Sequence, residues 1–372
     1  MKSKLLLLSA LVGLSGLAHA AIDLDGGIKL IPTATAGVQF NDNLFLSQNN
    51  EVNETVWVLA PGATLTSGEG AMNSMSFSYT EQFQVYSDNS NLNTSLSFVD
   101  LTSRYDDGKM KVGVDAWFHQ ANQATRDVRN ASRLINRDLL HGAFSDELKW
   151  SDKSSARAAV VYDSTSYKAS GYRDASYFEV PFQYFYQVQP KLDLSAGLRY
   201  RKNTIDGAGS LGSDEYFYSV GARGELTPKV TGEISLGYIQ FNPDSGKNQS
   251  SLGLQSQFNM ELTQKSAVKF GASNQYGYGA LGDSYRTTTL YSGVDLQLTA
   301  NLQLNGMVSY NQYSYSVGSR KDDFWSGLLS ATYTVTREFS VNGTLSHANN
   351  DSNLNLASFK NNILAVSASY RF

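Results

Sequence analysis

Apolar and polar residues alternate with a period of two along most of the chain, and this periodicity constrains the fold more than any other feature. In a β-strand, alternate residues point to opposite faces. The alternating runs last about 11 to 15 residues, compared with roughly 5–6 in soluble strands and 9–11 in strands that cross a bilayer. We therefore expect membrane-crossing strands. One such run has two distinct faces, Leu192, Leu194, Ala196, Leu198 and Tyr200 against Lys191, Asp193, Ser195, Gly197 and Arg199.

The connections between these runs alternate between short and long. Short turns are expected near Asp107, Asp152, Pro190, Pro228 and other Gly- or Thr-containing positions. Short periplasmic turns and long extracellular loops are typical of bacterial outer-membrane barrels. Nine long loops predict a transmembrane antiparallel β-barrel of about 18 strands, wide enough for an aqueous channel. The long polar segments are 46–53, 87–93, 122–137, 169–174, 205–214, 242–249, 277–285, 314–322 and 349–358.

The first 20 residues are typical of a secretory signal peptide. Lys2 and Lys4 precede an apolar run from Leu5 to Leu17, and Ala18-His19-Ala20 supplies a small-x-small cleavage site. An uncleaved anchor helix is less favoured, because the run is shorter than the roughly 20 residues that span a bilayer. We expect residues 1–20 to be removed and residues 21–372 to form the barrel.

The charge of the predicted mature chain argues against nucleic-acid binding. The whole chain has 30 basic and 34 acidic residues, and loss of Lys2 and Lys4 would leave a net charge of −6. Nucleic-acid-binding domains are usually basic. The sequence contains 0 cysteines, so an exported fold must be stabilised without disulfides, as a closed hydrogen-bonded barrel can be.

The last strand supports the same location. Leu364, Val366, Ala368, Tyr370 and Phe372 alternate up to an aromatic C-terminus. This ending resembles outer-membrane proteins generally, which implies recognition by the barrel assembly machinery. We expect the protein in the bacterial cell outer membrane, in contact with lipid and lipopolysaccharide.

A short segment near the start of the predicted mature chain resembles a known family. Residues 31–45 read IPTATAGVQFNDNLF, a strand ending in an aromatic residue, then Asp-Asn, then an apolar pair. This is similar to the putative β-barrel porin type 2 family, which includes barrels encoded with exopolysaccharide clusters. The resemblance implies export of a polysaccharide cargo together with a periplasmic polysaccharide-export protein. The residues by themselves indicate only a pore-sized barrel, so a diffusion porin for small solutes or oligosaccharides is the main alternative.

The polar faces of the strands predict the lining of the lumen. Their charges are of mixed sign and are interspersed with hydroxyl and amide side chains. One interpretation is a hydrated wall with cross-strand pairs, and the other is a path along which polar groups and aromatic rings contact a glycan. The candidate lining residues are Lys111, Asp115, Trp117, Asp193, Arg199, Arg201, Arg223, Tyr291 and Asp295.

The longest predicted loop, residues 122–137, contains four arginines, Arg126, Arg129, Arg133 and Arg137. Their spacings of three, four and four residues would place them on one face of a short helix. If the loop folds inward, it would form a basic constriction that concentrates anions. If it points outward, the same residues would contact lipopolysaccharide phosphates or water.

An outer-membrane hydrolase is a less favoured alternative. His119 and His141 flank the longest loop, with Asp115 and Ser145 nearby, so an acid–base pair is conceivable. However, we find no nucleophile motif, metal-ligand spacing or phosphate-binding loop. We therefore expect a channel without catalytic residues or a cofactor.

Overall fold

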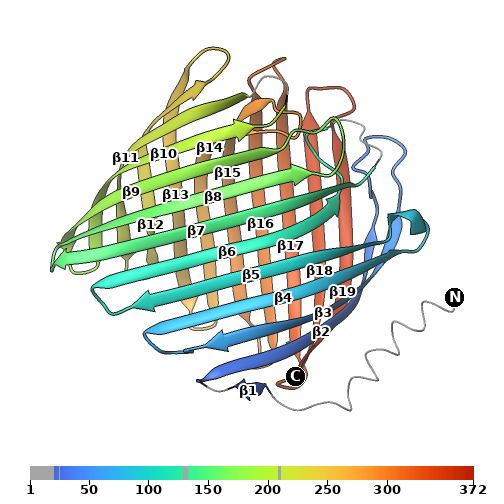
Figure 1. Cartoon of the computed structure of the whole chain (residues 1–372), viewed down its shortest axis with the longest axis horizontal. Coiled ribbons are helices and arrows are strands. Elements are labelled where there is room, and N and C mark those ends of the chain that lie inside the picture. The colour runs from blue at the N-terminus through green and yellow to red at the C-terminus, as the bar shows by residue number, and fades with distance from the viewer. Residues whose placement is uncertain (1–20, 25, 129–132, 208–210) are drawn as a thin grey trace.

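The chain forms a closed antiparallel β-barrel, as predicted (Figure 1). The computed structural model describes residues 21–24, 26–128, 133–207 and 211–372. Eighteen strands make the wall and a three-residue strand, β1 (Ile22–Leu24), lies outside it. The wall strands are β2 (Ile28–Asn41), β3 (Glu54–Ser67), β4 (Asn73–Tyr86), β5 (Thr94–Asp106), β6 (Met110–Gln123), β7 (Ile135–Ser151), β8 (Ser154–Tyr167), β9 (Ala175–Gln189), β10 (Leu192–Ile205), β11 (Leu211–Thr227), β12 (Val230–Pro243), β13 (Gln249–Thr263), β14 (Ser266–Tyr278), β15 (Ser284–Gln297), β16 (Leu302–Tyr315), β17 (Lys321–Thr334), β18 (Phe339–Ser352) and β19 (Phe359–Arg371).

The barrel closes between β2 and β19, which lie side by side in Figure 1. Their pairing runs from Thr33 opposite Arg371 to Asn41 opposite Ile363. The first residues of β2 extend beyond this pairing, and β1 folds back on them, with Ile22 opposite Leu30. β1 therefore covers the part of the β2 edge that β19 leaves unpaired, which protects it from pairing with another chain.

The connections alternate in length around the barrel, as the sequence predicts. Those at one end have two to five residues and those at the other have five to twelve. By the rule for bacterial barrels we assign the short turns to the periplasmic side and the long loops to the extracellular side. Several loops are shorter than predicted because the strands extend into the predicted loop segments, as with the connection 279–283, which the sequence predicts as 277–285.

The two faces of the wall differ as the alternation predicts. On β10, Leu194 and Leu198 point outward and are 49% and 43% exposed, whereas Ser195 and Arg199, each the next residue along the strand, point inward and are buried. The apolar outer face suits contact with lipid. In the described part of the chain, no helix is long and apolar enough to cross a membrane.

The wall bends sharply around β9 to β12, and glycines permit the bend. A Cβ on Gly237 would lie 1.8 Å from the carbonyl oxygen of Tyr218, and one on Gly221 would lie 2.1 Å from that of Ile234. Neighbouring strands can approach this closely only where side chains are absent. Apolar side chains fill the inside of the bend, where Phe217, Ile239, Phe241 and Tyr276 form a buried cluster.

Candidate functional site

The predicted lining residues all lie at inward-facing positions of their strands. Those of β6, Lys111, Asp115 and Trp117, alternate with outward-facing residues, and the pairing register continues this face onto β7. The others lie on β10, β11 and β15: Asp193, Arg199, Arg201, Arg223, Tyr291 and Asp295. They do not form one cluster, because they are spread from β6 to β15, over more than half of the wall strands.

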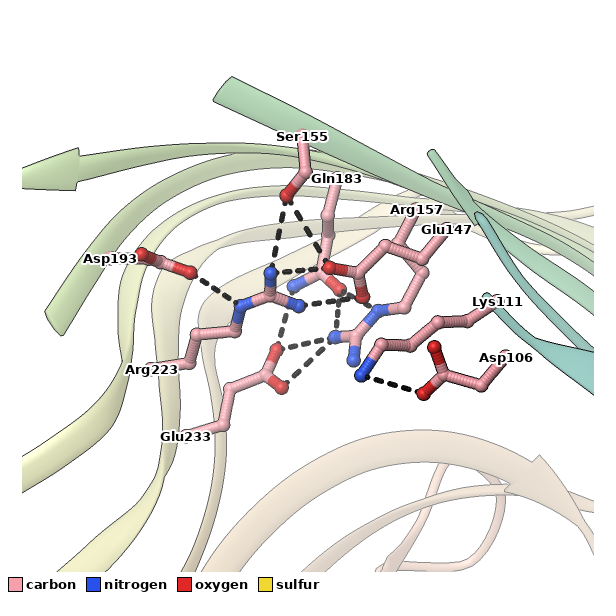
Figure 2. Close-up of polar contacts among 9 residues, drawn as sticks. All are labelled: Asp106, Lys111, Glu147, Ser155, Arg157, Gln183, Asp193, Arg223 and Glu233. Atoms are coloured by element: carbon pink, nitrogen blue, oxygen red, sulfur yellow. Dashed lines mark hydrogen bonds and ion pairs between the residues drawn. The ribbon is translucent and has the colours of Figure 1, made fainter. Parts of the chain in front are cut away.

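Arg223 of β11 forms an ion pair across the inside of the bend (Figure 2). Its guanidinium lies 2.5 Å from a carboxylate oxygen of Glu147 on β7 and 3.0 Å from one of Asp193 on β10. Strands β7 and β11 are four positions apart, about 19 Å along the sheet at roughly 4.8 Å per strand. The pair can form only because the wall curves and brings these strands face to face.

Arg157 of β8 makes a second contact of the same kind. Here the arginine lies on the side of β7 and β8, and the carboxylate lies on the side of β11 and β12. Arg157 lies 2.7 Å from Glu233 of β12 and also donates to Gln183 of β9. The ring of Phe185 lies close to both guanidiniums, with its centroid 3.4 Å from that of Arg223 and 5.2 Å from that of Arg157. We call this set of residues the cross-lumen strut; it joins β7 and β8 to β11 and β12.

A second layer of ion pairs lies nearer the extracellular end of the same wall. Arg199 donates to Glu215 at 2.6 Å, and Arg201 contacts Glu179 at 2.5 Å. Glu215 is fully buried and both arginines are nearly so. Charges buried to this degree are stable only when paired, so these residues cannot attract a free ion as an exposed arginine would.

A recess of about 420 Å³ opens from the lumen between β8 and β15. Arg157, Gln183 and Glu233 of the strut line one side. The rest of its polar lining consists of Arg199, Glu179 and uncharged groups, namely Ser219, Ser235, Gln255, Ser256, Gln257, Ser273 and Tyr291. The volume lies within the range of small-molecule sites.

The opposite wall, β16 to β19, has a different chemistry. Between its two rims, the inward positions of these fully described strands carry no charged side chain. Their hydroxyls and amides pair with one another instead. Ser309 lies 2.7 Å from Ser326, and Asn342 donates to Ser330 and Thr332 at 2.9 Å. The lumen therefore has two different walls. We call β7 to β12 the ion-paired wall and β16 to β19 the neutral wall.

The loop between β6 and β7 folds inward, at least in its described part. Asp127 accepts a hydrogen bond from the backbone N–H of Ala280, and its own carbonyl accepts one from Arg320 at 2.7 Å. Arg126 stacks on the ring of Tyr313, 3.5 Å from the centroid, and pairs with Asp127. Because β16 is ten strand positions from β6 in a wall of 18, the loop reaches across to the opposite wall.

The three loop arginines that the structure describes, Arg126, Arg133 and Arg137, do not share the helical face that the sequence predicts. Residues 125–128 form a turn, and Arg129 lies outside the described residues. Arg126 is already paired with Asp127, so its charge is compensated. Arg133 lies 5.5 Å from the ring of Tyr172, and Arg137 belongs to β7. For these described residues the prediction of a shared helical face is wrong, because Arg126 lies in a turn and Arg137 lies in a strand.

The two histidines flank Trp117 in the lumen. Both imidazoles stack on the indole, with ring centroids 4.6 Å from His119 and 5.3 Å from His141. His119 bonds Asp100 at 2.8 Å and His141 bonds Asp163 at 2.9 Å. Among the residues that the structure describes, no serine or threonine hydroxyl bonds either imidazole. The arrangement thus supplies a polar aromatic surface and lends the hydrolase interpretation no activated nucleophile.

Sequence reasoning did not single out several residues that organise the lumen. Phe185 could have been noticed as an aromatic residue in a polar register, between Gln183 and Gln187. Asp127 and Arg320 gave no such signal, because their contact joins loops 193 residues apart.

These features define a porin-like β-barrel of the bacterial outer membrane. The chain belongs to the family described as Putative beta-barrel porin 2, which matches residues 26–372.

Solved structures of other outer-membrane barrels are similar in fold. OccK5 (OpdH) of Pseudomonas aeruginosa is 12% identical, with a TM-score of 0.47 over 93% of this chain and 98% of that one. OpdL of the same species is 10% identical, with a TM-score of 0.48 over 93% and 98%. The siderophore receptor PirA from this species is 10% identical, with a TM-score of 0.47 over 92% and 80%. No curated protein matches the sequence.

Proposed function

We propose that the barrel conducts a polysaccharide across the outer membrane, in the direction of export. The observation that carries this proposal is the compensation of charge in the lumen. Arg157, Arg199, Arg201 and Arg223 of the ion-paired wall have carboxylate partners, and the neutral wall presents hydroxyls and amides.

A lining of this kind suits a hydroxylated cargo better than an ion. Paired charges produce a weak net field, so a passing ion gains little, whereas amides and hydroxyls can donate to and accept from sugar hydroxyls. Contacts of similar strength all along the path would let a chain advance without a deep energy minimum.

The proposal includes partners on both sides of the membrane. A periplasmic polysaccharide-export protein would deliver the chain to the short-turn end, and the barrel assembly machinery would insert the barrel. Lipid and lipopolysaccharide would surround its apolar exterior.

A diffusion porin for small solutes or oligosaccharides is the second candidate. The specific observation in its favour is the loop that carries Arg126 and Asp127 across the lumen to Tyr313 and Arg320. Such a crossing narrows the extracellular end, which suits a small solute better than a polymer.

The two functions are separated by deleting the gene and measuring surface polysaccharide. Loss of the polymer, restored by the intact gene, is the expected result. Normal polymer together with reduced uptake of oligosaccharides would overturn export and favour the diffusion porin. A complementary assay is swelling of liposomes that contain the purified barrel, in sugars of increasing size.

A further inference from the structure

We infer that the recess between β8 and β15 is a binding subsite for one or two uncharged sugar units. This inference rests on the proposed passage of saccharides, and it adds a specific binding position along their path through the lumen. The residues that we assign to contact with the sugar are Gln255, Gln257, Ser273 and Tyr291.

The first reason is the contrast between the two sides of the recess. On the strut side, Arg157, Gln183 and Glu233 bond one another, so their polar groups are already satisfied. On the other side, no hydrogen bond joins the side chains of Gln255, Gln257, Ser273 or Tyr291 to another described residue. One side is therefore held rigid while the other offers free donors and acceptors to a ligand.

The second reason is the position of Tyr291. It lies directly opposite Gly271 on β14, and a Cβ at Gly271 would lie 2.6 Å from its hydroxyl and 2.7 Å from a ring carbon. The ring thus lies against the wall in space that any other residue at position 271 would fill. The other face of the Tyr291 ring is then available to stack on the apolar face of a sugar ring.

The third reason is the charge of the recess. Arg157 lies 2.7 Å from Glu233, and Arg199 lies 2.6 Å from Glu215, so neither guanidinium is free to hold an anion. The remaining polar groups are amides and hydroxyls, each able to donate and accept. This combination matches the adjacent hydroxyls of a neutral sugar and gives an anionic group no unpaired partner.

The volume of the recess, about 420 Å³, sets the size of the ligand. It lies at the small end of the range for ligand pockets, which suits one or two sugar rings of a longer chain. The rest of the chain would lie in the lumen along the neutral wall. A shallow subsite of this kind would hold a polymer in register without trapping it.

The test is block of single-channel current by maltohexaose in planar bilayers, with the full-length barrel. We expect discrete blocking events in the parent protein. Tyr291→Ala should raise the dissociation constant about tenfold, as expected for loss of one aromatic contact. Tyr291→Phe should retain most of the affinity, and Gln257→Ala should weaken binding severalfold.

The matched control is Gln39→Ala, which removes an inward-facing glutamine of β2 far from the recess. It should leave block unchanged while showing that loss of a lumen amide does not alter folding. Equal block in Tyr291→Ala and the parent would overturn the subsite. Stronger block by oligogalacturonate than by maltohexaose would also overturn it, because the site would then select anions.

The failures of this inference and of the proposed function are distinguishable. If the parent protein restores surface polysaccharide in the deletion strain but maltohexaose never blocks it, export stands and the subsite falls. If maltohexaose blocks through Tyr291 but the deletion leaves surface polysaccharide unchanged, the subsite stands and belongs to a diffusion porin.

Discussion

The ion-paired wall and the neutral wall of this barrel face the same lumen but solve different packing problems. Around β9 to β12 the sheet bends so strongly that Arg223 reaches Glu147 four strands away. Across the lumen, on β16 to β19, polar side chains pair with immediate neighbours, such as Ser309 with Ser326. Charged side chains occur where the curvature lets side chains of distant strands form ion pairs. Where the wall does not bring distant strands together, hydroxyl and amide groups bond the adjacent strand instead.

This difference teaches that lumen charge is not by itself a sign of ion transport. A guanidinium between two carboxylates, such as Arg223 between Glu147 and Asp193, braces the bend. The same residue without partners would set up a field in the lumen. Removing one carboxylate partner therefore affects two properties, because it weakens the brace and leaves positive charge less compensated in the lumen.

The largest effect is expected for Glu215→Ala on the ion-paired wall. Glu215 is fully buried, and its loss leaves Arg199 without its 2.6 Å partner. Removing one member of a buried pair costs about 3–5 kcal/mol. Thr332→Ala on the neutral wall should cost about 1 kcal/mol or less. Urea unfolding of the refolded barrel in lipid vesicles measures both, and equal costs would remove the distinction between the walls.

The outer faces of the two walls should behave alike. Leu198 of β10 and Leu345 of β18 are both exposed to lipid near the middle of their strands. Arginine at either position should destabilise the barrel by about 2–4 kcal/mol if the side chain sits near the bilayer midplane. The same refolding titration provides the measurement. A large cost at one position and none at the other would show that the difference between the walls extends to the lipid face.

The sequence predicts the architecture well because strand alternation and turn chemistry are local properties. The faces of β10, the nine long loops and the aromatic last strand follow from neighbours within a few residues of one another. The pairing of Arg223 with Glu147 depends on the curvature of the closed wall, over 76 residues of sequence. The docking of Arg126 on Tyr313 likewise depends on a loop that crosses the lumen. Neither leaves a periodic signal.

A smaller effect, with a predicted direction for each wall, is expected on ion selectivity. Glu147→Gln leaves Arg223 with only Asp193 as a carboxylate partner, so permeability should shift toward anions. Asn342→Asp puts an unpaired carboxylate on the neutral wall and should shift permeability toward cations. Each shift should be about fivefold or less, since a charge at about 4 Å in water is worth roughly 1 kcal/mol. Reversal potentials in a salt gradient measure both, and shifts of the same sign would contradict the assignment.

The smallest effect is expected at the periplasmic turns, where the turn between β5 and β6 and a turn of the neutral wall bind their backbone N–H groups with different side chains. In the turn between β5 and β6, Asp107 accepts hydrogen bonds from the backbone N–H groups of Lys109 and Met110 at 2.9 and 2.7 Å. Between β17 and β18, Thr336 accepts equivalent bonds from Glu338 and Phe339. The backbone donors, Met110 first and then Lys109, hold the pKa of Asp107 below its usual value.

A group whose pKa is lowered by folding stabilises the fold above its unfolded pKa, and this contribution is lost as the pH falls through the folded value. Asp107→Ala should therefore lower the urea midpoint slightly at neutral pH and have no effect in acid below the lowered pKa. Thr336→Ala should lower the midpoint by a similar small amount at every pH, because a hydroxyl does not titrate there. Urea titrations at neutral pH and in acid compare the two variants. A pH-independent effect of Asp107→Ala would mean that its carboxylate charge does not contribute to the turn.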